Sequence, residues 1–378
     1  MGQRYPLFNR DRVVYEYHNE YLRIGADDDD TVQIKNHTEI WMELIRLSDG
    51  TNDLESICSV FYEKYGISKE KTIQFIKQFQ ERHLIEVLPC KYVPDEKELY
   101  FQSAFTYYSS RGLGGLDLLE RLQSLNIAVL GCGGGGSHIA FQLSQLGVGR
   151  IHIVDPDLVT VENVNRQALF TMDDIGRSKV EITKFMLESK NPFVNVSLSN
   201  ERLNCVSDVR REIAGADWVF CAMDEPPYIA QRIVNKACME LKTPSVYCFS
   251  QKSAGKMFMV NPGVSGCADC LLKSCDSEEF RSFIHIFLTN HQKVITANIY
   301  PNISILCAWI VKKWLDVFCG KANDPWNKLY RYDFDLFKEE VFTKYERQQT
   351  CPTCGGQSNE TAQCGDDGEL WELLKIRY

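Results

Sequence analysis

The sequence predicts an α/β protein: a Rossmann-like, doubly wound parallel sheet preceded by a smaller α+β domain. A buried strand, a glycine-rich loop and an apolar helix follow one another between residues 126 and 146. Further strand-like apolar runs alternate with helical patterns through the rest of the chain, as in a parallel sheet with crossover helices. The first 92 residues differ, because short strands come first and three helical patterns follow. At 378 residues, the chain is long enough for two or three domains.

The composition is that of a soluble globular protein, with 44% hydrophobic and 25% charged residues. A net charge of −9 argues against nucleic-acid binding as the main task. We expect no membrane association, because no apolar run approaches the roughly 20 residues that span a bilayer. The 15 cysteines occur without the apolar N-terminal segment of a signal peptide, which favours reduced thiols in the cytoplasm.

We expect residues 1–92 to form a winged-helix-like α+β domain. The strand patterns cover 13–17, 21–24 and 31–34, and the helical patterns begin near Thr38, Leu54 and Ser68. An acidic run from Asp27 to Asp30 disfavours DNA binding by such a domain. Residues 93–122 are predicted to be a linker whose aromatic side chains serve packing. Residues 123–378 then form the Rossmann-like domain.

The glycine-rich loop is the strongest local signal. It follows the strand Ile127–Leu130 and leads into a helix, and its key positions are Gly131, Gly133, Gly134 and Gly136. This order places backbone N–H groups at a helix N-terminus, where a phosphate can be held. The next strand, 150–154, ends at Asp155, whose carboxylate suits a ribose hydroxyl. The loop alone would also fit a nicotinamide dehydrogenase, or a glycine turn that binds no ligand.

Polar residues after the second strand favour a different chemistry. Their positions are Asp157, Asn163, Arg166, Gln167 and Lys179. Cations and amides at this place suit triphosphate cleavage, because negative charge develops on the leaving pyrophosphate. With the glycine loop, this series resembles the ThiF/MoeB-like adenylating family, which is related to ubiquitin-activating enzymes. The resemblance implies ATP binding by the glycines, Asp155, Asp157, Asn163, Arg166, Gln167 and Lys179.

The resemblance also implies a magnesium site. Asp224 follows the apolar strand 218–222, and in the family this position holds the magnesium that bridges the phosphates. Arg166, Lys179 and Asp224 are therefore the predicted catalytic residues. Asp224 could instead only cap the helix that begins near Pro226, and Glu225 could be a second acid or a first-turn residue. Relatives often supply an arginine from the preceding segment to the partner subunit's ATP. Here that segment contains no arginine before Arg111, which is a poor substitute.

Two Cys-x-x-Cys pairs predict a metal centre. They are Cys267-Ala-Asp-Cys270 and Cys351-Pro-Thr-Cys354. Four thiolates close a tetrahedral zinc site and leave no open coordination position, so we expect structural zinc. The resemblance implies that the loop between the pairs lies over the active site, where some relatives carry a sulfur-accepting cysteine. We expect Cys275 to be non-catalytic, because it lies only five residues after Cys270 and no partner is visible.

The N-terminal domain resembles PqqD-like clamps that bind the leader of a ribosomally made peptide as an added strand. The resemblance rests on Leu47-Ser48-Asp49-Gly50-Thr51, the helix that follows, and Tyr65-Gly66-Ile67-Ser68. Its alternative is a winged helix used for dimer packing. A clamp joined to an adenylating domain is similar to the maturation enzymes of pantocin A and microcin C, and implies a homodimer acting on a short precursor peptide.

The predicted function is therefore ATP-dependent activation of a peptide carboxylate, with internal condensation of a glutamate side chain into a bicyclic core. Transfer of a nucleotide to the peptide's C-terminus, as in microcin C maturation, is the main alternative. Activation of a sulfur-carrier or ubiquitin-like protein would call for a dedicated nucleophilic cysteine. A non-catalytic peptide scaffold and a nicotinamide dehydrogenase are the remaining alternatives, and ATP turnover distinguishes both of them from the first prediction.

Overall fold

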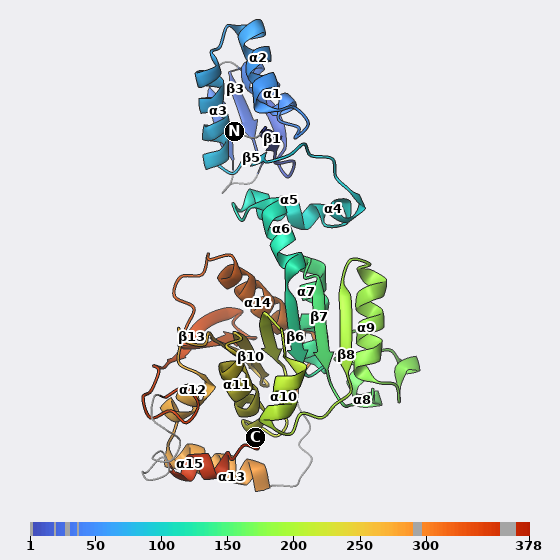
Figure 1. The fold of residues 1–378 in the computed structure, drawn as a ribbon, viewed down its shortest axis with the longest axis vertical. Coiled ribbons are helices and arrows are strands. Elements are labelled where there is room, and N and C mark those ends of the chain that lie inside the picture. Colours follow the sequence, from blue (N-terminus) through green and yellow to red (C-terminus); the bar gives the residue numbers. More distant parts are fainter. Residues whose placement is uncertain (1–2, 19, 27–30, 36–37, 290–296, 356–367) are drawn as a thin grey trace. The chain divides into compact units, whose positions relative to one another are not determined.

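The computed structural model describes residues 3–18, 20–26, 31–35, 38–289, 297–355 and 368–378. The chain divides into two compact units, Met1–Arg121 and Leu122–Tyr378, which are treated separately (Figure 1). The acidic run at Asp27–Asp30 lies outside the described residues. Among the described helices, none combines the length and the apolar character needed to cross a membrane.

The first unit contains two small antiparallel sheets. Its strands are β1 (Tyr5–Phe8), β2 (Val14–Tyr17), β3 (Tyr21–Ile24), β4 (Val32–Lys35) and β5 (Ile85–Leu88). One sheet has the order β2-β3-β4, and β1 pairs with β5 in the other. The predicted three strands are confirmed. The β1–β5 sheet was not predicted, because its strands are four residues long and pair across about eighty positions of sequence.

Three helices pack on these sheets: α1 (Thr38–Leu47), α2 (Leu54–Tyr65) and α3 (Lys69–Glu81). Capping residues determine where α2 and α3 begin and where α2 ends. Asp53 and Ser68 accept backbone N–H bonds as N-caps of α2 and α3, and Gly66 ends α2 with a φ of 66°. The apolar faces of all three helices meet the fully buried Leu22 and Ile24 of β3. The prediction of three helices is confirmed.

The segment after β5 is helical. It contains α4 (Glu96–Tyr100), α5 (Gln102–Ser110) and α6 (Gly115–Ser124). Phe101, Phe105 and Tyr108 are buried, as expected for aromatic residues that serve packing. The predicted linker at 93–122 is thus built of short helices rather than extended chain.

The second unit is built on an eight-stranded sheet. Its strands are β6 (Asn126–Leu130), β7 (Arg150–Val154), β8 (Asn195–Ser199), β9 (Trp218–Cys221), β10 (Ser245–Ser250), β11 (Ala254–Val260), β12 (Lys328–Asp333) and β13 (Lys338–Lys344). They lie in the order β13-β12-β11-β10-β9-β6-β7-β8. From β10 to β8 neighbouring strands are parallel, and from β10 to β13 they are antiparallel. The predicted doubly wound parallel sheet is confirmed.

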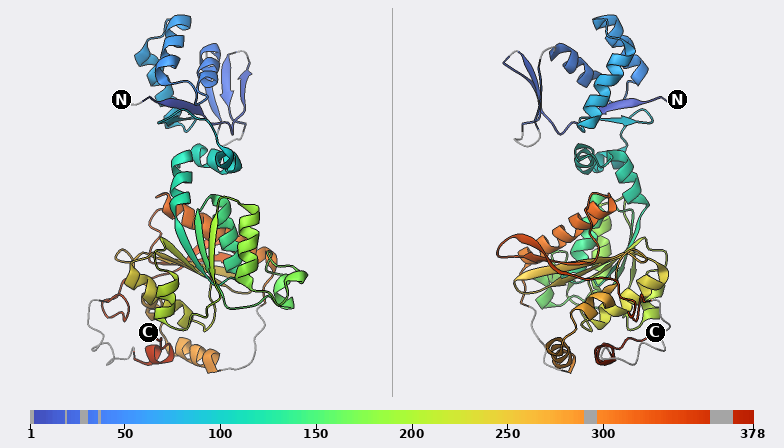
Figure 2. Two further views of the ribbon diagram at one scale, coloured as in Figure 1. Left: turned by 45° about the vertical axis from the view of Figure 1, so that its right-hand side comes forward. Right: turned by 90° about the vertical axis from the view of Figure 1, so that its left-hand side faces the viewer.

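Helices cover both faces of this sheet (Figure 2). On one face lie α7 (Gly134–Leu146), α9 (Lys179–Lys190) and α14 (Tyr300–Phe318). On the other lies α11 (Ile229–Leu241), packed against α10 (Val206–Glu212) and α12 (Ala268–Ser274). Shorter elements are α8 (Val161–Val164), a 3-10 turn at Met172–Asp174, and α15 (Gly368–Leu373). A further helix, α13 (Glu278–Thr289), occupies a segment in which the sequence showed no clear period.

Strand order locates the candidate site. From β6 the chain winds outward through β7 to β8, and then returns to place β9 on the other side of β6. The carboxyl ends of β6 and β9 are therefore neighbours at the point where the winding reverses. Ligands of open α/β sheets bind at such a point. The glycine loop follows β6, and Asp224 follows β9.

Candidate nucleotide site and cysteine metal centre

At some positions of the glycine loop the fold itself requires glycine, and at others it leaves room for a side chain. Gly131 has a φ of 91°, and a Cβ there would lie 2.8 Å from the carbonyl oxygen of Ala222, just after β9. A Cβ on Gly136 would lie 1.8 Å from the carbonyl oxygen of Gly131. By contrast, a Cβ on Gly133 would approach only the Gln167 amide, at 3.9 Å, and one on Gly135 would meet nothing within 4 Å. Packing does not demand glycine at these last two positions, whereas close approach of a ligand does.

The loop leads directly into a helix N-terminus. Gly133 is the N-cap of α7 and has no side chain to accept from the first-turn N–H groups. Such unsatisfied donors, together with the helix dipole, favour an anion. The arrangement predicted from the sequence is therefore present in space.

Asp155 ties this loop to β7. Its side chain is only 7% exposed, and it accepts hydrogen bonds from the backbone N–H groups of Cys132 (2.6 Å) and Asp157 (2.8 Å). Burial raises the pKa of the Asp155 carboxyl, while the Cys132 N–H and the nearby Lys179 oppose that rise. Asp155 thus holds the glycine loop against the end of the neighbouring strand.

Lys179 interacts with three carboxylates of the site. It begins α9 and is 6% exposed, and its Nζ lies 3.0 Å from Asp157 Oδ2. It also interacts electrostatically with Asp155 and Asp224. A buried ammonium is stable only with such partners. The ends of two strands, β7 and β9, therefore contribute three acids to one lysine.

Asp224 lies at the exit of β9, beside this lysine. Its side chain is exposed to solvent, yet desolvation by the surrounding chain and the charge of Glu225 raise the pKa of its carboxyl. Lys179 opposes that rise. The alternative that Asp224 only caps a helix is wrong, because α11 begins at Ile229 with Tyr228 as its N-cap.

The three residues around α8 take different positions. Asn163 is buried, and its side-chain oxygen accepts from Thr160 N (3.1 Å) within the capping box of α8. The Arg166 guanidinium donates to the Glu162 carbonyl oxygen. Gln167 is 4% exposed, lies against the glycine loop and leaves its Oε1 without a hydrogen-bond partner within the described chain. A donor group of a bound ligand would satisfy this buried oxygen.

One residue near the site was not predicted. Gln231 of α11 is buried, and its Nε2 donates to the carbonyl oxygen of Met223 at 2.7 Å. This bond fixes the backbone immediately before Asp224. A single glutamine within an amphipathic helix gives no local signal, so only the packing of α11 under β9 shows this contact.

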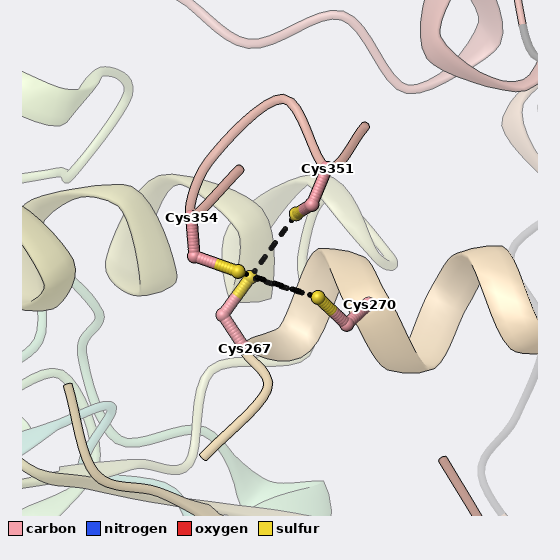
Figure 3. A group of neighbouring side chains, drawn as sticks. All are labelled: Cys267, Cys270, Cys351 and Cys354. Atoms are coloured by element: carbon pink, nitrogen blue, oxygen red, sulfur yellow. Dashed lines mark hydrogen bonds between the residues drawn. The ribbon is translucent and has the colours of Figure 1, made fainter. Parts of the chain in front are cut away.

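The four predicted cysteines converge in space (Figure 3). All are buried, and their sulfur atoms lie within 4.8 Å of one another. Cys267 Sγ lies 3.5 Å from Cys351 Sγ, and Cys270 Sγ lies 3.3 Å from Cys354 Sγ. A regular tetrahedron with zinc–sulfur bonds of about 2.3 Å has edges of about 3.8 Å, so the cluster could hold a metal ion such as zinc.

A family model now decides the class of the protein. The model of the ThiF family matches residues 108–353. The chain belongs to the ThiF family. Among curated proteins it is similar to the sulfur carrier protein ThiS adenylyltransferase of Escherichia coli, with 30% identity over 157 residues, 41% of this chain and 61% of that protein. The match spans between 23% and 61% of the length of the first four curated relatives.

Solved structures extend the likeness to most of the chain. Escherichia coli MccB, crystallised with AMPCPP and MccA, has a TM-score of 0.69 at 20% identity and covers 93% of this chain and 99% of its own. A structure of PaaA has a TM-score of 0.67 at 18% identity and covers 89% of this chain and 99% of its own. At these identities the likeness shows a shared fold, including that of the first unit.

A buried ion pair supports the cysteine cluster of this ThiF-family chain. Arg232 of α11 is bidentate to Asp269, with distances of 2.9 and 3.1 Å, and the two side chains are 5% and 0% exposed. Asp269 lies between Cys267 and Cys270, and it also accepts from Thr353 Oγ1 (2.7 Å), which lies between the other two cysteines. Asp269 therefore links both Cys-x-x-Cys turns to α11, the helix that also carries Gln231.

Two other candidates lie at helix ends. Cys275 is half-buried at the end of α12 and interacts electrostatically with Tyr228 and Lys256. Arg111 ends α5 in the first unit. Neither position adds support to a catalytic role for these residues.

Proposed function

We propose that this ThiF-family protein uses ATP to activate a carboxylate of a short, ribosomally made precursor peptide. The observation that carries the proposal is the position of Lys179. It is a buried cation shared by Asp155, Asp157 and Asp224 where the sheet reverses its winding, beside a glycine loop that is open to a ligand. Relatives named as adenylyltransferases support the nucleotide chemistry.

The residues of the site suit attack by a carboxylate on ATP. The first-turn N–H groups of α7 would hold phosphate oxygens, and Asp155 would accept from a ribose hydroxyl. A peptide carboxylate oxygen attacks the α-phosphorus, the bond to the β-phosphate breaks, and pyrophosphate leaves. Lys179 and Arg166 would neutralise the charge that develops on the phosphates, with Asn163 and Gln167 offering amides. A second nucleophile of the peptide then attacks the acyl carbon and releases the nucleotide.

The acids that follow β7 and β9 fit a magnesium ion. Asp224, Glu225 and Asp157 provide only oxygen donors, which magnesium prefers. Desolvation, followed by the negative charges of Glu225 and Asp157, raises the pKa of the Asp224 carboxyl, and a bound cation would stabilise its ionised form. When bound, magnesium would screen the phosphates of ATP. The cysteine cluster would hold zinc in a structural role, because four thiolates leave no open position.

The first unit would capture the leader of the peptide. Its sheet order β2-β3-β4 leaves the outer edge of β4 without a partner strand within the described chain. Such an edge can accept an added strand. Side chains of β4 alternate between half-buried and exposed, so an added strand could continue the same pattern. MccB, named a microcin C7 biosynthetic enzyme, shares this fold over the length of the chain.

The test combines the protein with ATP, magnesium and a short peptide encoded beside its gene. Peptide mass and released nucleotide are measured together. Loss of water, or of water and carbon dioxide, with nucleotide release supports condensation of a glutamate carboxylate within the peptide. The Lys179→Ala variant should abolish turnover, while Lys190→Ala, at the exposed end of the same helix, should not.

Other results would change the assignment. A mass gain equal to a nucleotide would indicate transfer to the peptide C-terminus. Turnover only with a sulfur-carrier or ubiquitin-like protein would replace the peptide as substrate. Tight peptide binding without any ATP turnover would refute the enzymatic proposal and leave a peptide scaffold.

A further inference from the structure

The first unit contains a cavity that the proposed chemistry does not use. Its volume is about 210 Å³. It is bounded by the end of β1, by β5, by the turn after α3 and by one face of α5. The lining residues used below are Phe8, Asn9, Arg10, His83, Glu86, Tyr92, Phe105 and Gly112. All of them belong to the first unit, and none belongs to the glycine loop or the cysteine cluster.

One part of the cavity is apolar and aromatic. Phe8 and Phe105 are buried side chains, and the rings of Tyr92 and Phe105 stack with centroids 6.1 Å apart and planes 25° apart. These rings provide flat apolar surface against which a flat or branched hydrocarbon group can pack. The cavity therefore suits a ligand with an apolar body.

The lining of the cavity also carries polar groups of both signs. Asn9 is 6% exposed and lines the cavity, and its Nδ2 has no hydrogen-bond partner within the described chain. A buried donor left unsatisfied costs free energy that a ligand acceptor would recover. Arg10 lies at the rim and interacts electrostatically with Tyr92. Glu86 also lines the cavity, accepts from Ser109 Oγ at 2.6 Å and contributes a negative charge.

His83 and Gly112 line the cavity and contact each other. The backbone of His83 has a φ of 55°, and that of Gly112 has a φ of 64°. A Cβ on Gly112 would lie 2.3 Å from the His83 ring, so the imidazole packs directly on the glycine backbone. Asn9 is fixed by its own N–H bond to the Leu84 carbonyl oxygen, at 2.9 Å. Two left-handed residues in contact thus hold the turn after α3 against the end of α5.

We propose that this cavity binds a single α-amino acid with an apolar or aromatic side chain. Asn9 and Arg10 would receive the carboxylate, Glu86 would receive the ammonium group, and the rings of Phe8, Tyr92 and Phe105 would enclose the side chain. The volume is below the range of about 300–1,000 Å³ that holds drug-sized ligands, and it matches one small zwitterion instead. This site is additional to the ATP-dependent activity and does not rest on it.

The test measures binding of defined probes to the full-length protein by calorimetry, with thermal unfolding as a second readout. The probes are L-phenylalanine, L-leucine, phenethylamine, 3-phenylpropionate and L-phenylalanine amide. The two amino acids should bind and raise the unfolding temperature. The three analogues, each of which lacks one charge of the zwitterion, should bind at least about tenfold more weakly.

Two variants connect this binding to the cavity. Arg10→Gln removes the rim cation at an exposed position and should weaken L-phenylalanine binding about tenfold, whereas Arg82→Gln at a nearby exposed position should not. Asn9→Asp keeps the side-chain shape and should abolish binding by repelling the carboxylate. The proposal is overturned if neither amino acid binds, if the amide binds as tightly as the acid, or if Arg10→Gln binds like the wild type.

Discussion

The ion pair between Arg232 and Asp269 should be decisive for the stability of the second unit and for metal binding by its cysteine cluster. Asp269→Asn leaves the shape of the side chain nearly unchanged but removes its charge. Arg232 would then be a buried guanidinium without a counter-charge, because its second contact is the neutral Leu374 carbonyl oxygen. Thr353 would also lose a charged acceptor, which loosens the link between the two Cys-x-x-Cys turns.

The magnitude follows from burial. The two side chains are 5% and 0% exposed, so solvent cannot compensate for the missing charge. Breaking such a pair by removing one partner costs about 3–5 kcal/mol, and Asp269→Asn should fall near the lower value because the amide still accepts one hydrogen bond. Loss of a residue that orients metal ligands lowers metal affinity by about 10–100-fold. We therefore expect both effects together.

Urea unfolding followed by tryptophan fluorescence measures the stability change. Trp41 is the one tryptophan of the first 121 residues, so a Trp41→Phe background makes the signal report on the second unit. Competition with a chromophoric chelator measures zinc affinity. Glu279→Gln is a matched control, since it neutralises an exposed acid of α13 and should change stability by less than about 0.5 kcal/mol.

A double variant separates charge from packing. Arg232→Met combined with Asp269→Asn removes both charges, so it should lose less free energy than the sum of the two single variants. The reasoning is refuted if Asp269→Asn lowers the free energy of unfolding by less than about 1 kcal/mol, or if the two substitutions are additive.

Three further predictions concern the nucleotide site. Gly136→Ala should lower the free energy of unfolding by about 1–3 kcal/mol, because the new Cβ would lie 1.8 Å from the Gly131 carbonyl oxygen. Gly135→Ala should leave the free energy of unfolding unchanged and should only weaken ATP binding, which calorimetry measures. Lys179→Met should lower ATP–pyrophosphate exchange by about 10²–10³-fold, and retention of half the activity would exclude its proposed role. Because the pKa of the Asp224 carboxyl is raised, its protonation on acidification begins at a higher pH than for an ordinary aspartate. The magnesium concentration for half-maximal exchange should therefore increase as pH falls, and a pH-independent value would contradict this.

The sequence by itself determined the features that depend on neighbouring residues. The loop from Gly131 to Gly136 is recognisable because turn geometry and phosphate approach both exclude side chains within a few positions. The cysteine pairs are recognisable because two ligands of one metal must come from one tight turn. Helices α1, α2, α3, α7 and α14 follow from apolar periodicity, and the starts of α2 and α3 also follow from the caps Asp53 and Ser68. By contrast, α13 forms where the sequence shows no clear period.

Only the tertiary structure decided how these pieces meet. The position of β9 beside β6 brings Asp224 to the glycine loop, and no local pattern specifies which strands become neighbours. Gln231, the link from Asp269 to Arg232, and the cavity at Asn9 all depend on contacts between residues that are distant in the sequence or belong to different elements. Such contacts form when apolar faces pack. That packing, and not the composition of any one segment, determines which polar side chains come within hydrogen-bond distance.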